Sequence, residues 1–392
     1  MNRPLNILTL STLFPNATSP NFGIFVERQT AELASRAEAN ATVINPIGIP
    51  PWPLNKHDQY KALNSLPEHE QWRGLNVHRP RFKLIPKIGG PKNPTYIAKA
   101  ILPLVKKLHS ETPFDLIDAE FFYPDGPAAM RLSAVLDIPF TIKARGADIH
   151  HWSGDPKCRE QILTAAEKAS ALIAVSAALK ADMIKLGMND DRITVHYTGL
   201  DQEKFKPVDR AAEKHRLGVD GPLFICAGAL IPRKNQSLVI EALSAFPDAV
   251  LMLAGKGEEE DNYRSLAKDR GFEDRVRFLG NVPHDELPKM VAASDISILV
   301  SKSEGLANAW VEALACGTPI IISEAGGARE LVQSDIAGRV VDQDSNAIVG
   351  AIEDILKSPP AQKDVRATVN HFSWKNNGDQ LLTLFQDAAT ES

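Results

Sequence analysis

Short apolar runs separated by amphipathic stretches make up most of the chain. Leu5–Ser11, Leu116–Ala119 and Phe140–Lys143 are such runs in its first half. Runs of about four to eight apolar residues are typical of strands that are buried on both faces of a parallel sheet. The stretches between them, such as Gly126–Leu136, place apolar residues at helical spacing. This alternation of strand and helix predicts an α/β protein with doubly wound parallel sheets.

The alternation runs through both halves of the chain, so it predicts two series of strand–helix units. Further elements of the first series are the strands Ala41–Asn45, Asn76–Arg79, Ala171–Val175 and Ile193–Tyr197, with helices at Val26–Ala37, Lys157–Lys168 and Ala177–Leu186. The second series has strands at Leu223–Ala227, Val250–Ala254, Val276–Leu279, Ile296–Val300, Pro319–Ile322 and Arg339–Val341, with helices at Ser237–Phe246 and Glu258–Gly271. We expect two Rossmann-like domains that face each other across a cleft.

The polar segment Gly199–Val208 separates the two series, and we interpret it as the linker. The predicted domains are residues 1–204 and 205–372, followed by an amphipathic helix within 373–392. Residues 46–94 interrupt the first series with nine prolines. We expect an irregular excursion there, with Asn76–Arg79 as its one strand.

Composition and charge exclude several classes of protein. The net charge of −5 is small for 392 residues, so nothing global favours nucleic acid. The three cysteines form no C-x-x-C pair, and Cys226 and Cys316 lie in apolar runs, which suits core positions in a reducing compartment. No run approaches the roughly 20 apolar residues of a membrane span. The N-terminal run reads as a strand rather than a signal peptide, and we expect a cytoplasmic protein.

Glu304 and Glu312 are the most informative charged pair. Glu304 follows the predicted strand Ile296–Val300, and Glu312 lies in a predicted helix that Asn308 would cap. Ligands bind open α/β sheets at the carboxyl ends of the strands. The two carboxylates could accept hydrogen bonds from sugar hydroxyls, or they could be a loop residue and a residue favoured by the helix dipole. The backbone N–H groups after Gly305 would suit a phosphate.

A pair of cations, Arg233 and Lys234, follows Gly228 at the end of another predicted strand. The pair could clamp a diphosphate and stabilise it as it leaves, or form a solvated basic loop. Nearby, Gly255–Gly257 resembles the start of G-x-G-x-x-G, but Glu260 occupies the third glycine position. We therefore expect a tight turn there and no dinucleotide site.

In the first half, Arg145, Asp148 and His150 follow the predicted strand Phe140–Lys143 and would edge the cleft. For His150 an exposed loop position is the alternative. The adjacent histidines, His150 and His151, point their side chains apart and give no metal motif.

A basic stretch, residues 71–110, contains nine Lys or Arg and no Asp or Glu. It could contact an anionic membrane surface or a phosphorylated acceptor. A solvated basic face is the alternative.

The stretch from Glu304 to Glu312 has the form E-x7-E and is followed by ALACGTPII and GGARELV. With GALIPRKN at 228–235, it resembles a family 4-type retaining glycosyltransferase of the GT-B fold. The segments STLFPNATSPNFGIFVERQTAEL, YPDG and RGADI resemble the bacterial subgroup that makes exopolysaccharides or teichuronic-acid-like polymers. The resemblance covers nearly the whole chain.

The resemblance implies a retaining transfer from a UDP- or GDP-sugar to a glycan or lipid-linked acceptor, without a cofactor or metal. It makes 1–204 the acceptor-side domain and 205–372 the nucleotide-sugar domain, with 373–392 packing back on the first. It gives Glu304 the donor-sugar hydroxyls, Glu312 the ribose and Lys234 the phosphate. The implied catalytic residues are Glu304, Lys234, Arg233, Arg145 and Asp148, and the implied donor-binding residues are Gly23, Gly305, Leu306, Ala307, Asn308, Glu312, Gly228 and Val282.

Two positions depart from the family pattern. Ala229 stands where many relatives have an arginine, which Arg233 could replace. Arg145–Gly146 stands where many relatives have His-Gly. A GT-B-fold nucleotide-sugar epimerase and a non-catalytic nucleotide-sugar-binding module are the alternatives to a transferase, while a Rossmann oxidoreductase is disfavoured by the missing third glycine.

Overall fold

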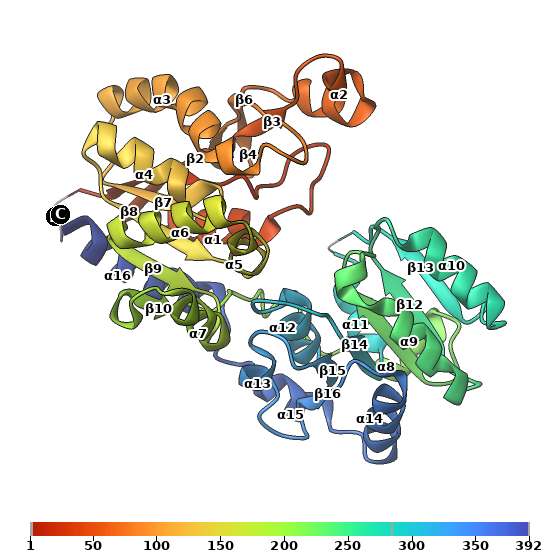
Figure 1. Cartoon of the computed structure of the whole chain (residues 1–392). Helices are drawn as coiled ribbons and strands as arrows, with labels where there is room; N and C mark the ends of the chain where they lie inside the picture. Colours follow the sequence, from red (N-terminus) through yellow and green to blue (C-terminus); the bar gives the residue numbers. More distant parts are fainter. Residues whose placement is uncertain (1–2, 284, 391–392) are drawn as a thin grey trace. The chain divides into compact units, whose positions relative to one another are not determined.

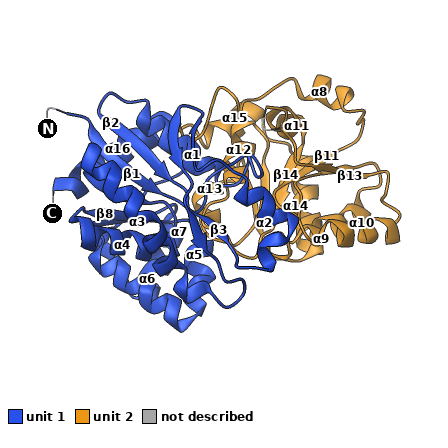
Figure 2. Ribbon diagram, turned by 90° about the horizontal axis from the view of Figure 1, so that it is seen from above, with its two compact units in different colours: residues 1–199, 374–392 blue, residues 200–373 orange. Residues whose placement is uncertain are grey.

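The structure, a computed structural model, describes residues 3–283 and 285–390 (Figure 1). It divides the chain into two compact units (Figure 2). Unit 1 joins the residues up to Gly199 to those from Trp374 onward, and unit 2 is Leu200–Ser373. The units part at Gly199 rather than at residue 204, because Gln202 already bonds within unit 2. Its Nε2 donates to the carbonyl oxygen of Phe372 at 2.7 Å.

The strands of unit 1 are largely the apolar runs of the first series. They are β1 (Leu5–Leu10), β2 (Ala39–Ile44), β3 (Ile47–Ile49), β4 (His69–Trp72), β5 (Leu75–His78), β6 (Arg81–Lys83), β7 (Leu116–Ala119), β8 (Phe140–Ala144), β9 (Ala171–Ala174) and β10 (Ile193–Val195). Eight of the described strands form one sheet in the order β10-β9-β8-β7-β1-β2-β5-β4, and β3 pairs with β6 alone. In the large sheet β4 is antiparallel to β5 and the other described pairs are parallel.

Helices connect these strands. They are α1 (Ile24–Ala34), α2 (Asp58–Asn64), α3 (Asn93–Glu111), α4 (Asp125–Leu136), α5 (Ala147–His150), α6 (Pro156–Lys168), α7 (Ala177–Leu186) and the C-terminal α16 (Trp374–Thr390), with short 3-10 turns η1 (Leu54–Lys56), η2 (Gly90–Lys92), η3 (Trp152–Gly154) and η4 (Asp190–Arg192).

The region 46–94 is more ordered than the sequence predicted. It contains β3, β4, β5, β6 and α2, where one strand was expected. Two of these strands are three residues long, too short to show a hydrophobic period. β4 and β5 form a hairpin whose turn residues, Arg73 and Gly74, both have positive φ, at 49° and 86°.

Unit 2 repeats the doubly wound plan with a six-stranded parallel sheet in the order β13-β12-β11-β14-β15-β16. Its strands are β11 (Leu223–Ala227), β12 (Val250–Ala254), β13 (Val276–Gly280), β14 (Ile296–Leu299), β15 (Ile320–Ser323) and β16 (Gly338–Val341). Its helices are α8 (Arg210–Arg216), η5 (Pro232–Lys234), α9 (Gln236–Ala242), η6 (Leu243–Ala245), α10 (Glu260–Asp269), α11 (Leu287–Ala293), α12 (Asn308–Ala315), α13 (Ala328–Leu331), α14 (Ser345–Lys357) and α15 (Gln362–Ala367). Cys226 and Cys316 are buried.

α16 follows unit 2 in the chain but packs on unit 1. Leu381, Phe385 and Ala388 are buried in one cluster with residues of β1 and α1. Arg36, just after α1, pairs with Asp379 at 2.5 Å. No helix in the described part of the chain has the length and apolarity to cross a bilayer.

We expect Phe385→Ala to lower the free energy of unfolding of unit 1 by about 3–5 kcal/mol, because it removes a fully buried ring and leaves a cavity. Urea unfolding followed by circular dichroism would show an earlier transition. Thr383→Ala, at an exposed position of the same helix, is the matched control. An unchanged transition for Phe385→Ala would contradict the packing of α16 on unit 1.

Candidate active site

The sheet of unit 2 changes direction between β11 and β14. These two strands are neighbours, with Phe224 opposite Ile296, but the chain continues from β11 to β12 on the other side. Loops that leave neighbouring strands in opposite directions open a crevice at the carboxyl end of the sheet. The loop after β11 carries Lys234, and the loop after β14 carries Glu304.

Glu304 pairs with both cations of the opposite loop. Its Oε1 lies 2.5 Å from Lys234 Nζ, and its Oε2 lies 3.2 Å from an Arg233 guanidinium nitrogen. The Glu304 side chain is 9% exposed and that of Lys234 is 13% exposed. The three residues that the sequence selected separately therefore form one charge cluster.

The cluster lowers the pKa of Glu304. Burial alone raises the pKa of this carboxyl, but the charges of Lys234 and Arg233 outweigh burial and hold it below the ordinary value. Glu304 is therefore ionised at neutral pH, and the two positive charges are partly neutralised by it.

Backbone contacts hold the two loops together. The N–H of Lys302 donates to the carbonyl oxygen of Arg233 at 2.8 Å, and the Arg233 guanidinium donates to the carbonyl oxygen of Ser303. The N–H of Gly327, in the loop after β15, donates to the carbonyl oxygen of Gly305 at 2.8 Å and ties a third loop to the loop of Glu304. These bonds fix the positions from which Arg233 and Glu304 project.

α12 begins beside Glu304. Its N-cap is Ala307 and no side chain caps it, so the predicted capping role of Asn308 was wrong and Asn308 is the first helical residue. Gly305, Leu306 and Ala307 are buried, and in the described part of the chain no side-chain hydrogen bond caps the start of α12. Such an end favours an anion.

Glu312 lies about one turn into α12 and is half-buried. Gly228 and Val282 follow β11 and β13, so both lie at the same carboxyl edge of the sheet. A Cβ on Gly228 would lie 3.9 Å from Lys234 Cε, which places Gly228 beside the phosphate candidate.

Gly255–Gly257 forms the tight turn that the sequence predicted. The carbonyl oxygen of Lys256 accepts from the N–H of Leu230 at 3.0 Å. A Cβ on Gly257 would lie 2.0 Å from the carbonyl oxygen of Leu230. The glycine is needed because the cation-bearing loop packs directly against it.

The candidates in unit 1 lie at the carboxyl edge of its sheet. Gly23 precedes α1 with φ 72°, and a Cβ there would lie 2.5 Å from the carbonyl carbon of Leu13. Asp148 is fully buried and accepts from the backbone N–H groups of Phe122, Arg145, Gly146 and Ile149 at 2.7–3.2 Å. Asp148 therefore holds the loop that follows β8.

Arg145 is fixed by three contacts. Its guanidinium pairs with the buried Glu120, Nε donates to the Glu120 carbonyl oxygen at 3.2 Å, and the group lies 4.7 Å from the ring centroid of Phe25. Its side chain is 9% exposed. His150 lies farther out, with Nε2 3.1 Å from Asp182.

A buried polar network behind Arg145 was missed by the sequence analysis. Lys143 Nζ donates to Gln29 and lies 2.8 Å from His196 Nδ1. His196 Nε2 lies 2.8 Å from the carbonyl oxygen of Asn377 on α16. A carbonyl oxygen only accepts, so Nε2 carries the proton and Nδ1 accepts from Lys143. The sequence feature that could have indicated this network is Lys143, a charged residue inside the apolar strand β8.

Burial sets the ionisation of this network. It lowers the pKa of Lys143 to about 7, against the neighbouring charge of Glu120. Burial and the charge of Lys143 lower the pKa of His196 to about 3, so the imidazole is neutral. Burial alone raises the pKa of Glu120, but Arg145 and Lys143 outweigh it. Among the described residues, no group of three or more His, Cys, Asp or Glu side chains could hold a metal ion.

Both units are Rossmann-like and have charged residues at the carboxyl edge of the sheet, and this plan matches solved structures of the GT-B class. A family model for Glycosyltransferase Family 4 matches residues 26–204, and a model for Glycosyl transferases group 1 matches residues 208–385. The chain belongs to these group 1, family 4-type glycosyltransferases, which confirms the predicted fold and family and makes it a nucleotide-sugar-dependent enzyme.

Relatives share this assignment. A Bacillus subtilis (strain 168) protein named as the teichuronic acid biosynthesis glycosyltransferase TuaC is 28% identical over 407 aligned residues, which cover 99% of this chain and 100% of that one. A GDP-mannose-dependent alpha-(1-6)-phosphatidylinositol monomannoside mannosyltransferase of Mycolicibacterium smegmatis is 32% identical over 206 residues, covering 47% of this chain and 54% of that one.

Solved structures agree in fold. Sucrose-phosphate synthase from Thermosynechococcus elongatus superposes with a TM-score of 0.83 at 21% identity, covering 99% of this chain and 100% of that one. Anabaena Alr3699/HepE in complex with UDP-glucose superposes with a TM-score of 0.75 at 21% identity, covering 97% and 99%.

Asp125, in the YPDG motif, makes the stability of the protein depend on pH. Asp125 Oδ2 accepts from Thr12 N at 2.8 Å, while Oδ1 has no hydrogen-bond partner among the described residues, and burial raises the pKa of Asp125 to about 8. The folded pKa lies above the ordinary value of 3.8, so folding takes up a proton between these two values. The contribution of Asp125 to stability therefore falls as the pH rises through this window.

We expect Asp125→Asn to gain at least about 3 °C in melting temperature relative to wild type between pH 5 and pH 9, because the amide never ionises. Thermal melts across this range test it. Asp137→Asn, at an exposed helix end, is the control. A constant difference across the range would show that Asp125 keeps an ordinary pKa.

Proposed function

We propose that the enzyme transfers a sugar, with retention of anomeric configuration, from a UDP- or GDP-sugar to a glycan or lipid-linked acceptor in cell-surface polysaccharide synthesis. The observation that carries this proposal is the pairing of Glu304 with Lys234 and Arg233 at the switch point of the unit 2 sheet. The name of TuaC supports a role in polysaccharide synthesis. The UDP-glucose complex of Alr3699/HepE supports a UDP-sugar as donor.

The donor exchanges ion pairs as it binds. Without donor, Glu304 partly neutralises Lys234 and Arg233. The diphosphate carries more negative charge than one carboxylate, so it takes over both cations. Glu304 is then released to accept hydrogen bonds from hydroxyls of the donor sugar, since an ionised carboxylate has only acceptor sites.

Other residues of unit 2 complete the donor site. The N–H groups after Gly305, with Leu306, Ala307 and Asn308, bind the phosphates together with the dipole of α12. Glu312 accepts from the ribose hydroxyls. Gly228 and Val282 lie beside the nucleotide, at the ends of β11 and β13.

Unit 1 supplies the remaining roles. Arg145 takes the place of the family histidine as the cationic group that faces the reacting sugars, oriented by Glu120 and Phe25. Asp148 is a positioning residue, since backbone donors already occupy its carboxylate. Gly23 brings the backbone before α1 close to the donor phosphate.

The transfer needs no covalent enzyme intermediate. The bond between the anomeric carbon and the diphosphate oxygen breaks, and the acceptor oxygen bonds to the same face of that carbon. The acceptor proton passes to the departing diphosphate. Lys234, Arg233 and the start of α12 stabilise the charge that develops on the leaving group, so the proposal assigns no step to a metal.

The function is tested by incubating the protein with UDP- and GDP-sugars and candidate acceptors. We expect an acceptor-dependent product whose anomeric configuration, measured by NMR, matches that of the donor. Conversion of a nucleotide sugar without acceptor would favour an epimerase. Nucleotide binding with no product for any pair would favour a binding module.

Charge variants test the exchange of ion pairs. Glu304→Gln should bind UDP or GDP about tenfold more tightly, because a negative charge no longer competes, while transfer falls at least about 100-fold. Lys234→Met should weaken binding about 10- to 100-fold. Isothermal titration and product assays measure both effects.

Glu353→Gln and Lys357→Met, exposed on α14, are the matched controls and should change neither quantity. Weaker nucleotide binding by Glu304→Gln would show that Glu304 supports the phosphate site and does not compete with it.

A further inference from the structure

Three large apolar side chains are exposed in neighbouring loops of unit 1. Trp52 is 72% exposed, Leu54 is 41% exposed and Ile88 is 82% exposed. Single exposed apolar residues are ordinary, but a group in one region marks an interaction surface. No role in the donor site accounts for these three.

The topology brings the two loops together. β3 and β6 are parallel, with Ile49 opposite Lys83, and the N–H of Leu84 extends the ladder by donating to the carbonyl oxygen of Ile49 at 3.0 Å. The chain therefore leaves both strands at the same end. Residues 50–54 and 84–88 follow directly, and they carry the exposed apolar side chains.

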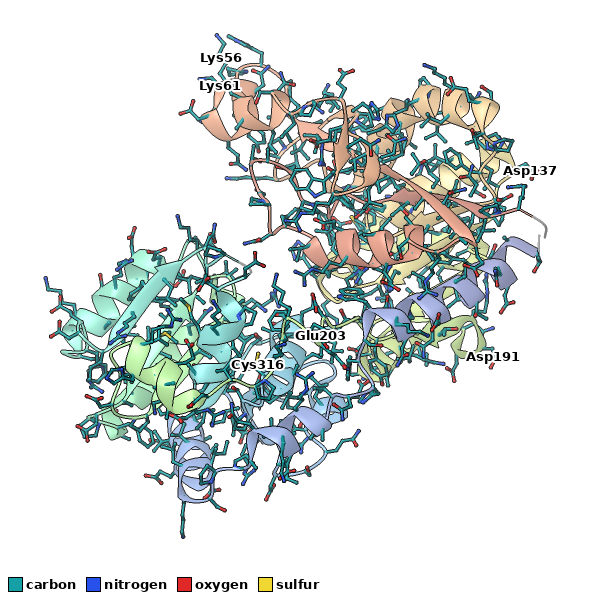
Figure 3. All side chains as sticks on the ribbon, turned by 180° about the vertical axis from the view of Figure 1, so that it is seen from behind. Lys56, Lys61, Asp137, Asp191, Glu203 and Cys316 are labelled. Atoms are coloured by element: carbon teal, nitrogen blue, oxygen red, sulfur yellow. The ribbon has the colours of Figure 1, made fainter. Side chains whose placement is uncertain are left out.

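Lysines surround these loops. Lys56, Lys61, Lys83, Lys87 and Lys92 are all exposed, and Figure 3 shows Lys56 and Lys61 projecting outward from the η1–α2 segment of unit 1. The nearby acids are fewer. Asp58 pairs with Lys61 at 3.0 Å, Glu70 pairs with the buried Arg79 at 2.6 Å, and Glu68 is exposed. The net charge of the region is positive.

We propose that a loop-tip patch, formed by Trp52, Leu54, Ile88 and the five lysines, docks unit 1 on an anionic lipid surface. Apolar side chains at loop tips enter the headgroup region, where tryptophan is favoured. The lysines bind the lipid phosphates. A solvated basic face would not need exposed tryptophan and isoleucine side chains.

The patch differs from the basic stretch 71–110 that the sequence suggested. Arg79 is fully buried and pairs with Glu70 at 2.6 Å, so it does not belong to a free basic face. Trp52, Leu54 and Lys56 come from outside that stretch. The surface is therefore set by the pairing of β3 with β6 and not by one run of sequence.

Vesicle sedimentation of the full chain tests the proposal. We expect pelleting with vesicles of 70:30 phosphatidylcholine and phosphatidylglycerol at low salt, and little with phosphatidylcholine alone. High salt should reduce pelleting because it screens the lysines. Lys56→Gln and Lys83→Gln should each weaken binding about fivefold, and the double variant Trp52→Ser/Ile88→Ser should abolish it.

Val135→Ser and Lys168→Gln, at exposed positions elsewhere in unit 1, are the matched controls and should pellet as wild type does. Equal pelleting with neutral vesicles, or wild-type pelleting of the patch variants, would overturn the proposal. So would dimerisation in sedimentation velocity that the patch variants abolish, since the patch would then bind a second copy. None of these readouts depends on the transfer reaction, so the patch can fail while the proposed function stands.

Discussion

The pairing of Glu304 with Lys234 and Arg233 is the interaction on which the unit 2 site depends. Three structural conditions are met at this pairing. The sheet opens between β11 and β14, the loops that follow these two strands bond to each other, and the adjacent positive charges of Lys234 and Arg233 need a negative partner. A glutamate between the two cations satisfies the last condition. In the proposed function, the donor diphosphate takes the place of Glu304 as the partner of the two cations.

Unit 1 handles charge differently at the same edge of its sheet. Glu120 and Arg145 pair with each other, and Lys143 is bonded to Gln29 and His196. The bonds connect β7, β8, α1 and the segment before unit 2, while His196 reaches α16. Removing one partner would leave a buried charge unpaired, which costs several kcal/mol. This network therefore fixes the loop of Arg145, whereas the cluster in unit 2 is more open to solvent, with the Arg233 side chain 39% exposed.

The sequence predicted the elements that depend on local pattern. Core strands such as Leu223–Ala227 have the predicted bounds, because a fully apolar run between turn residues permits little else. β3 and β6 were missed because each strand is three residues long, which is too short to show an alternation of apolar and polar residues. The partners of Lys143 were missed for another reason. Gln29 and His196 are 114 and 53 residues away in the chain, and only the sheet order brings them to β8.

The same distinction explains what was predicted of the sites. Glu304 and Lys234 could be selected because each follows a strand, but their mutual contact across 70 residues follows only from β11 lying beside β14. Asp148 was selected by the same reasoning and proved to serve its own loop, since a carboxylate after a strand can bond to backbone N–H groups as readily as to a ligand. Position after a strand thus identifies candidates, and the kind of partner separates them: Asp148 accepts from backbone N–H groups of its own loop, whereas Glu304 pairs with side-chain cations of another loop.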